Sequence, residues 1–200
     1  GALMGTLKRF VSIALTSGLL LFLVGDVLHA EDIEGTIVRT LLLSEDTRLV
    51  GDVTCRVEGA ACIRFGAPGI TLSLNGFTMT GLANATTGCS GANVTGEFGI
   101  STNNQSDVGV RGPGVVQRFR AVGIIFAGTV RGQIEGVTAT TNCLSGILVN
   151  ATSSHISVDA NVSVRNGAVA VTAAAVTGEA GRGGITIFGS DNRIRWNETG

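Results

Sequence analysis

Isoleucine preceded by glycine recurs along the chain at nearly constant intervals. The pairs are Gly99-Ile100, Gly123-Ile124, Gly146-Ile147 and Gly184-Ile185. The last interval is longer than the others and becomes equal to them when an insertion between the third and fourth pairs is subtracted. A fixed period of about 20–50 residues is typical of solenoids, in which each repeat stacks on its neighbours.

Between and before these pairs the residues follow the pattern of short strands. Ile70–Leu74 alternates apolar and polar side chains, which predicts a strand with one buried face. Asn75-Gly76 closes it and predicts a turn, because both residues tolerate positive φ. A hairpin would make the flanking strands antiparallel, but the long-period repeat favours a bend between consecutive sheets. Similar strand-like runs are Leu49–Cys55, Ala61–Phe65 and Phe77–Gly81.

The later repeats align with one another beyond the Gly-Ile pair. Each offers a first strand after the pair, a polar corner and a second strand that reaches Ile134, Ile156 or Ile194. We expect these three isoleucines to form one buried column. Alternation with Ile194 places Trp196 in the core as well, and a platform on which a sugar ring stacks is the alternative. Asparagines at the corners can cap backbone groups and accept left-handed geometry, and these are Asn142, Asn166 and Asn197. The sequence thus predicts an all-β fold, a parallel β-helix of about six rungs.

The chain divides into three expected segments. Residues 1–30 have a basic start at Lys8-Arg9, an apolar run and a small residue at Ala30, as in a secretory signal peptide; an uncleaved N-terminal anchor is the alternative. Residues 31–48 are expected to be a lead or cap segment, and residues 49–200 the β-helix. Within it, residues 168–183 are expected to be an external insertion, which either shapes a binding groove or is a low-complexity tongue. Because nothing near Gly200 resembles a polar cap, we expect the β-helix to be truncated at its C-terminus.

Export would make the four cysteines candidates for disulfides, since it places them in an oxidising compartment. Four cysteines allow three pairings. In one of them, Cys55 pairs with Cys62, which is close in sequence, and Cys89 and Cys143 then join distant rungs. Buried free thiols are the alternative. A zinc site is not expected, because the spacing contains no CxxC and no histidine lies nearby. The cysteines are Cys55, Cys62, Cys89 and Cys143.

Charge narrows the classes of partner. Only 14% of the residues are charged and the net charge is −1, where globular proteins average about 25% charged residues. Binding to nucleic acid needs clustered Lys and Arg, and no run of five like charges occurs. We therefore expect no nucleic-acid partner, and no stable membrane span once the signal peptide is cleaved, because its apolar run of about 15 residues is shorter than a bilayer needs.

Four stretches resemble a known group of proteins: Gly66–Phe77, Gly112–Phe119, Thr141–Ile147 and Gly189–Ile194. They are similar to secreted bacterial right-handed parallel β-helix proteins of the pectin-lyase-like superfamily, which includes carbohydrate-binding and sugar-hydrolysing repeats. The resemblance covers roughly residues 49–200. It implies a right-handed, single-stranded β-helix that is secreted, periplasmic or on the cell surface, but it does not fix an activity.

The catalytic residues implied by this resemblance are missing from the sequence. Hydrolases of the superfamily need an Asn-Thr-Asp run, a paired Asp-Asp and a Gly-His-Gly, and none occurs. Its calcium-dependent lyases need an acidic cluster, whereas the carboxylates after Asp52 are scattered singly. We therefore expect no cofactor and no metal site, with calcium the one ion that the resemblance keeps open, and the catalytic residues stay unknown.

Alignment of the second strands predicts an outward patch. If Val110, Ile134, Ile156 and Ile194 are equivalent, the residues after them form one exposed column of Arg111, Glu135, Ser157 and Arg195. We expect His155 beside Arg193 in the adjacent column, and Asp159 one alternation further along its strand. The candidate binding residues are Arg111, Glu135, His155, Asp159, Arg193 and Arg195.

Such a patch of Arg, His and Asp can hold an acidic sugar through charge-assisted hydrogen bonds. The alternative is a solvated face with weak ion pairs. The sequence therefore leads to two hypotheses. The first is an exported protein that binds a polysaccharide or cell-surface glycan and, if it is an enzyme, acts as a lyase, hydrolase or epimerase. The second is a structural or adhesive surface protein without catalytic activity.

Overall fold

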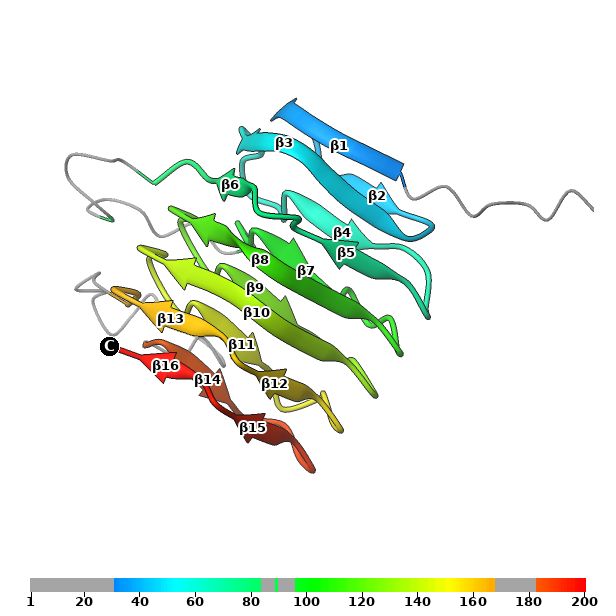
Figure 1. Ribbon diagram of the computed structural model, residues 1–200, viewed down its shortest axis with the longest axis vertical. Helices are drawn as coiled ribbons and strands as arrows, with labels where there is room; N and C mark the ends of the chain where they lie inside the picture. Colours follow the sequence, from blue (N-terminus) through cyan, green and yellow to red (C-terminus); the bar gives the residue numbers. More distant parts are fainter. Residues whose placement is uncertain (1–30, 84–88, 90–95, 168–182) are drawn as a thin grey trace, which may run out of the picture.

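The computed structural model describes residues 31–83, 89, 96–167 and 183–200. Within these ranges the secondary structure consists of strands, without a helix, and every pairing between strands is parallel (Figure 1). No helix in this part is long and apolar enough to cross a membrane. The predicted signal peptide and almost all of the predicted insertion lie outside the described residues.

The strands belong to two sheets, between which the chain passes back and forth. The ten-stranded sheet contains β1 (Glu31–Ile37), β3 (Thr47–Cys55), β5 (Thr71–Ser73), β6 (Thr78–Thr80), β8 (Gly109–Gln117), β10 (Gln133–Thr140), β12 (Ser157–Asp159), β13 (Val162–Val164), β15 (Arg193–Arg195) and β16 (Glu198–Thr199). The six-stranded sheet contains β2 (Leu41–Leu43), β4 (Ile63–Phe65), β7 (Ile100–Ser101), β9 (Ile124–Phe126), β11 (Ile147–Val149) and β14 (Ile185–Ile187). This all-β arrangement of parallel strands is compatible with a parallel β-helix.

The Gly-Ile repeat lies at the start of the strands of the six-stranded sheet. Ile100, Ile124, Ile147 and Ile185 face one another in register, so the chain returns to the register after the predicted insertion. The preceding glycines allow the close stacking. A Cβ on Gly123 would lie 2.7 Å from the carbonyl oxygen of Gly146, which is closer than real Cβ contacts come. Leu41 and Ile63, which have no glycine before them, extend the same column.

The parallel strands begin earlier than the sequence predicts. The segment 31–48, expected to be a lead or cap, contains β1, β2 and the start of β3. β1 pairs with β3, and β2 pairs with β4. The prediction that the pattern starts near Leu49 is therefore wrong for the strand positions, and the segment contributes one strand to each sheet before β3.

The buried column predicted through Ile156 runs through Val158 instead. Val110, Ile134, Val158 and Ile194 are in register. Ile156 is also fully buried, but it lies opposite Gly132, where the missing side chain leaves the space that its Cδ1 approaches.

The far end of that column departs from the prediction as well. Ile194 is 44% exposed on β15, the last strand in the order of its sheet. Trp196 is not in the core: it is 79% exposed, has a φ of 55° and lies under the guanidinium of Arg195. Alternation with Ile194 therefore ends at β15, because the backbone turns there.

Asparagines form two short ladders at the corners. Asn142 donates to Oδ1 of Asn166 from both its backbone and its side-chain nitrogen, and Asn161 does the same to Asn197. Each side-chain nitrogen of Asn142 and Asn161 also donates to a backbone carbonyl of the preceding repeat. The predicted corner role is confirmed, because these amides satisfy backbone groups that the sheets leave unpaired.

The structure contains two disulfides, and of the three possible pairings it has the one that joins the cysteines nearest in sequence. Cys55 is bonded to Cys62, seven residues away, and Cys89 to Cys143, 54 residues away. The first closes the corner between β3 and β4. The second joins parts of the chain that are distant in sequence, and both its cysteines pack against Ala83.

Candidate functional site

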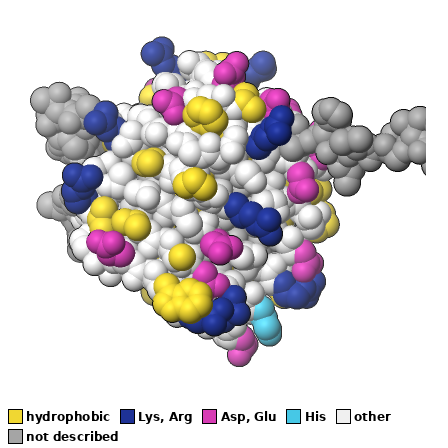
Figure 2. Space-filling view, viewed as in Figure 1, with side chains coloured by type: hydrophobic (Ala, Val, Ile, Leu, Met, Phe, Trp, Pro, Cys, Tyr) yellow, Lys and Arg dark blue, Asp and Glu magenta, His cyan; other side chains and the backbone are white. Residues whose placement is uncertain are grey.

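Polar and charged side chains cover the part of the ten-stranded sheet where its strands begin, on the face turned away from the core. Strand register places them in two columns. Figure 2 shows this face with basic and acidic side chains scattered among uncharged ones. The column that we name the charged ladder contains Asp32, Arg48, Ser73, Arg111, Glu135, Asp159 and Arg195. The column that we name the polar ladder contains Thr71, Gly109, Gln133, Ser157 and Arg193.

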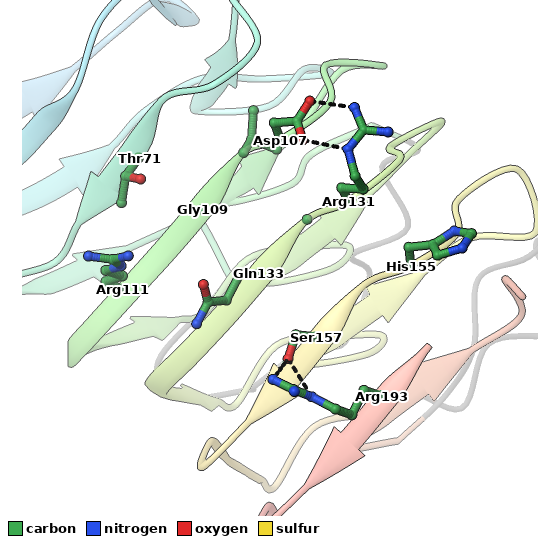
Figure 3. Close-up of a pocket in the computed structure, with 11 residues that line it drawn as sticks. Thr71, Asp107, Gly109, Arg111, Arg131, Gln133, His155, Ser157 and Arg193 are labelled. Atoms are coloured by element: carbon green, nitrogen blue, oxygen red, sulfur yellow. Dashed lines mark hydrogen bonds and ion pairs between the residues drawn. The ribbon is translucent and has the colours of Figure 1, made fainter. Parts of the chain in front are cut away.

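Two neighbouring hollows lie over these ladders. The larger has a volume of about 390 Å³ and extends from Thr71 to Arg193, with the side chains of Arg131 and His155 at its rim (Figure 3). The second, of about 340 Å³, lies between Asp46 and Arg111. Both are lined by Thr71 and Arg111, so together they form one groove that crosses the strands.

Most arginines of the groove are neutralised by a nearby carboxylate. Arg131 donates two hydrogen bonds to Asp107, at 2.6 and 2.7 Å, and Arg48 is paired with Asp32. The hydrogen bond from Arg131, opposed by burial and supported by the charge of Arg131, holds the pKa of Asp107 below its ordinary value. These pairs are exposed, so each contributes little to stability.

Arg111 differs from the other arginines of the groove. It is exposed, and among the described residues its guanidinium has no carboxylate within ion-pair distance. Its neighbour in the charged ladder, Glu135, instead accepts a hydrogen bond from Gln133 at 3.0 Å. The groove therefore contains one arginine without an ion-pair partner, which has Glu135 as its register neighbour and shares the second hollow with Asp46.

Asp159 is the buried centre of a cluster at the other end of the groove. The residue is only 6% exposed, and its Oδ2 accepts hydrogen bonds from Ser157 at 2.5 Å and from Arg193 at 2.8 Å. Arg195 lies 3.5 Å from Oδ1. Burial raises the pKa of Asp159, but the hydrogen bonds from Ser157 and Arg193 and the charges of Arg193 and Arg195 outweigh it. The pKa of this carboxyl therefore lies below its ordinary value.

Because the pKa of Asp159 is lowered, its ionised carboxylate should stabilise the folded protein, and this stabilisation should be lost in acid. A carboxylate whose pKa falls on folding stabilises the protein fully above its unfolded-state pKa of about 3.9, and this stability is lost as the pH falls through the folded-state pKa. The free energy of unfolding of the parent should therefore fall more steeply below about pH 4 than that of Asp159→Asn. Urea unfolding at a series of pH values measures both slopes, and equal slopes would contradict the prediction.

The structure brings together most of the predicted site residues, with one shift. Arg111, Glu135 and Arg195 share a column as expected, but their neighbour is Asp159 and Ser157 lies in the polar ladder opposite Arg193. The predicted position of this strand was wrong by two residues, because the alignment placed Ile156 where the structure has Val158.

His155 also lies elsewhere than predicted. It is at the corner before β12 with a φ of 58°, and its backbone nitrogen donates to Ser190, so it is not the register neighbour of Arg193. Both residues nevertheless line the larger hollow (Figure 3).

Sequence reasoning missed several groove residues. Asp107 and Arg131 lie at left-handed corner positions two residues before β8 and β10, and Thr71 and Gln133 begin their strands. Asp107 precedes Arg131 by the same interval that separates Ile100 from Ile124, and this equality was a usable signal for the ion pair.

The described ranges contain no group of three or more His, Cys, Asp or Glu side chains that could hold a metal ion. Comparison with known proteins finds no matching protein family, no similar curated protein and no similar solved structure.

Proposed function

We propose that this chain is an exported, right-handed parallel β-helix of about six rungs, of the pectin-lyase-like kind, that binds acidic polysaccharide in the groove over the charged and polar ladders. The observation that carries the proposal is Arg111, an arginine without an ion-pair partner in a groove that is otherwise lined by hydroxyl and amide groups, paired charged groups, His155 and Asp46. Two disulfides fit an oxidising compartment and so support export.

The groove suits a chain-like ligand because its side chains repeat along the direction that crosses the strands. Neighbouring strands lie about 4.7–4.9 Å apart, so the polar ladder offers a donor or acceptor at almost every strand. Thr71 and Gln133 can bind sugar hydroxyls, whereas the Ser157 hydroxyl is already bonded to Asp159 and Arg193. Arg111 can bind a sugar carboxylate with two parallel hydrogen bonds, which gives specificity for an acidic residue.

The groove supports binding better than hydrolysis. Glycoside hydrolysis usually needs two carboxyl groups on either side of the scissile bond. Asp159 is held by Ser157 and two arginines, and Asp107 is held by Arg131, so neither is free to act as an acid or nucleophile. Near the larger hollow this leaves Glu135 as the carboxylate that is not held by an arginine. Because a single such carboxylate does not make a pair, we assign no lyase, hydrolase or epimerase activity.

Replacement of Arg111 by alanine tests this proposal. Removing a charge-assisted hydrogen bond costs about 1.5–3 kcal/mol, so we expect affinity for an acidic polysaccharide such as polygalacturonate or alginate to fall by about tenfold or more. Arg39→Ala is the matched control, because Arg39 is also exposed but lies outside both hollows. Titration calorimetry of the purified chain measures both.

Two results would overturn the proposal. One is the absence of binding to every acidic polysaccharide in a panel that includes neutral glycans. The other is equal affinity of Arg111→Ala and Arg39→Ala. Binding that survives Arg111→Ala but is lost at high salt would indicate general electrostatic attraction rather than this groove.

A structural or adhesive role is the second candidate. It is favoured by an exposed aromatic side chain at the corner after β15, that of Trp196, which is 79% exposed and lies under the guanidinium of Arg195. Exposed apolar groups of this size are a feature of protein-contacting surfaces. Retained adhesion to a surface by a chain that binds no glycan, lost in Trp196→Ser, would favour this role.

A further inference from the structure

The polar ladder has one position without a side chain. Gly109 lies on β8 between Thr71 of β5 and Gln133 of β10, and both neighbours are in register with it. All three residues line the larger hollow, and Figure 3 shows Gly109 on the strand between the side chains of the other two. The ladder is therefore interrupted in the middle of the groove.

Two structural requirements account for most of the described glycines. Some lie against a neighbouring backbone: a Cβ on Gly112 or on Gly123 would come within 3 Å of a backbone atom of the next strand or corner. Others, such as Gly35 and Gly136, have a positive φ that side chains rarely adopt. In both groups the fold itself selects glycine.

Gly109 meets neither requirement. Its φ lies outside the left-handed region, and the register continues through it on both sides without a bulge. The nearest atoms to a Cβ built on it belong to the side chain of Thr71, with Oγ1 at 3.1 Å and Cγ2 at 3.4 Å. Thr71 is half-buried and can yield by a few tenths of an ångström. The fold therefore has room for a side chain at this position.

A glycine in a paired strand is unfavourable, because it loses more conformational freedom on folding than other residues and offers no side chain to pack. Gly109 is the first residue of β8 and is paired with a strand on each side. Where neither a bulge nor a close backbone requires it, a glycine in a strand often marks a place at which a ligand approaches the backbone closely. Its position in the larger hollow agrees with this reason.

The missing side chain leaves a gap beside Arg111. Thr71 and Gln133 lie one strand to each side of the gap, so their backbones are about 9.5 Å apart. Arg111 is two residues further along β8 and therefore projects from the same face, about 6.6 Å away. The backbone of Gly109 forms the floor of the gap and is buried between its neighbours. A hydroxyl, an amide and a guanidinium without an ion-pair partner thus surround one bare stretch of strand.

We propose that Gly109 is the point at which the bound polysaccharide touches the sheet: the ring of a uronic acid lies over Gly109, with its carboxylate on Arg111 and its hydroxyls at Thr71 and Gln133. The inference rests on the proposed function and adds the class of sugar and the residue that makes room for its ring. The C–H groups of a pyranose ring can pack against the strand where no side chain intervenes. A small anion that met only Arg111 would need no such gap.

Gly109→Val is the decisive variant, because it fills the gap with a side chain that strands favour. We expect its affinity for polygalacturonate, measured by titration calorimetry, to fall about tenfold or more, since the ring and the new side chain compete for the same space. Thr138→Val is the matched control: it places the same side chain on the same sheet face, on β10 and outside both hollows, and should bind like the parent.

Gly109→Ala keeps the test valid if valine disturbs the strand. It adds one methyl group, so its affinity should lie between those of the parent and Gly109→Val. The thermal unfolding temperature of both variants should equal or exceed that of the parent, because each replaces glycine in a strand. A lower unfolding temperature of Gly109→Ala would overturn the inference, since the fold itself would then require the glycine.

The binding data separate this inference from the proposed function. Equal affinities of Gly109→Val and Thr138→Val overturn the inference, and if Arg111→Ala still weakens binding, the proposed function stands without it. A parent that binds no acidic polysaccharide overturns both. Affinity that falls from the parent through Gly109→Ala to Gly109→Val, without a loss of thermal stability, is the result that we expect.

Discussion

Replacement of Phe126 by alanine is expected to lower the free energy of unfolding by about 3–5 kcal/mol. Phe126 is completely buried in β9, in the middle of the six-stranded sheet. A Cβ on Gly132 would lie 2.7 Å from its ring, which shows how closely the opposite corner packs against it. The strands on both sides are fixed by parallel backbone pairing, so the cavity left by the ring cannot collapse fully, and the loss should lie in the upper part of this range.

Phe188→Ala is the matched control for that experiment. Phe188 is 49% exposed, so its truncation should cost about 1 kcal/mol. Urea unfolding followed by far-ultraviolet circular dichroism measures both variants, and it is preferable to fluorescence because the single tryptophan, Trp196, is largely exposed. Equal losses for the two phenylalanines would contradict the position of Phe126 in the core.

The two disulfides should differ in their contribution to stability. Cys89–Cys143 closes a loop of 54 residues and Cys55–Cys62 one of seven. In the chain-entropy treatment a crosslink stabilises the folded state more when the loop is longer, by about 4 kcal/mol for the first and about 2.5 kcal/mol for the second. The double variant Cys89→Ser/Cys143→Ser should therefore be the less stable.

The two double variants provide each other's control, because each removes one disulfide and leaves four serine or cysteine side chains of similar size. Their unfolding midpoints in urea, measured with unchanged slopes, give the comparison. A larger loss for Cys55→Ser/Cys62→Ser would indicate that this disulfide acts on the folded corner, where Gly59 donates to the buried carboxylate of Glu97 at 2.8 Å.

The six-stranded sheet could be predicted from the sequence because the Gly-Ile motif recurs at a nearly constant interval and has a characteristic composition. A glycine before each isoleucine signals close stacking, and a constant interval signals register. Leu41 and Ile63 occupy the same column without the glycine, so the first strands of this sheet carried no such mark. Of the strands in 31–48, β2 was missed for this reason, whereas β1 and β3 belong to the ten-stranded sheet, whose strands do not carry the Gly-Ile motif.

The ten-stranded sheet was harder to predict because the corners differ in length. The path from the Gly-Ile pair to the buried column is longest in the repeat that reaches Val158, shorter in the one that reaches Ile134 and shortest in the one that reaches Ile194. An alignment that assumes equal corners selects Ile156, which is apolar and buried but lies opposite Gly132. This explains why Asp159 was placed outside the column that it shares with other charged residues.

The charge of the groove depends on which acidic and basic side chains lie close enough to pair, and the sequence pattern does not give these distances. Asp107 and Arg131 lie one repeat apart and pair, whereas Arg111 and Glu135, also one repeat apart, do not form an ion pair. The difference arises from the position on the coil: the first pair is at a left-handed corner and the second is on flat strands, where Gln133 reaches Glu135 first.

The stacked columns also determine how such a protein can change length. A single residue inserted within β10 would turn its following side chains to the opposite face, so that buried residues such as Val137 would meet water. Insertion of one whole repeat, as long as the interval from Ile100 to Ile124, would instead add a strand to each sheet and one position to every ladder. Duplication of a repeat is therefore the tolerated evolutionary step, and it would lengthen the groove in increments of about 4.8 Å.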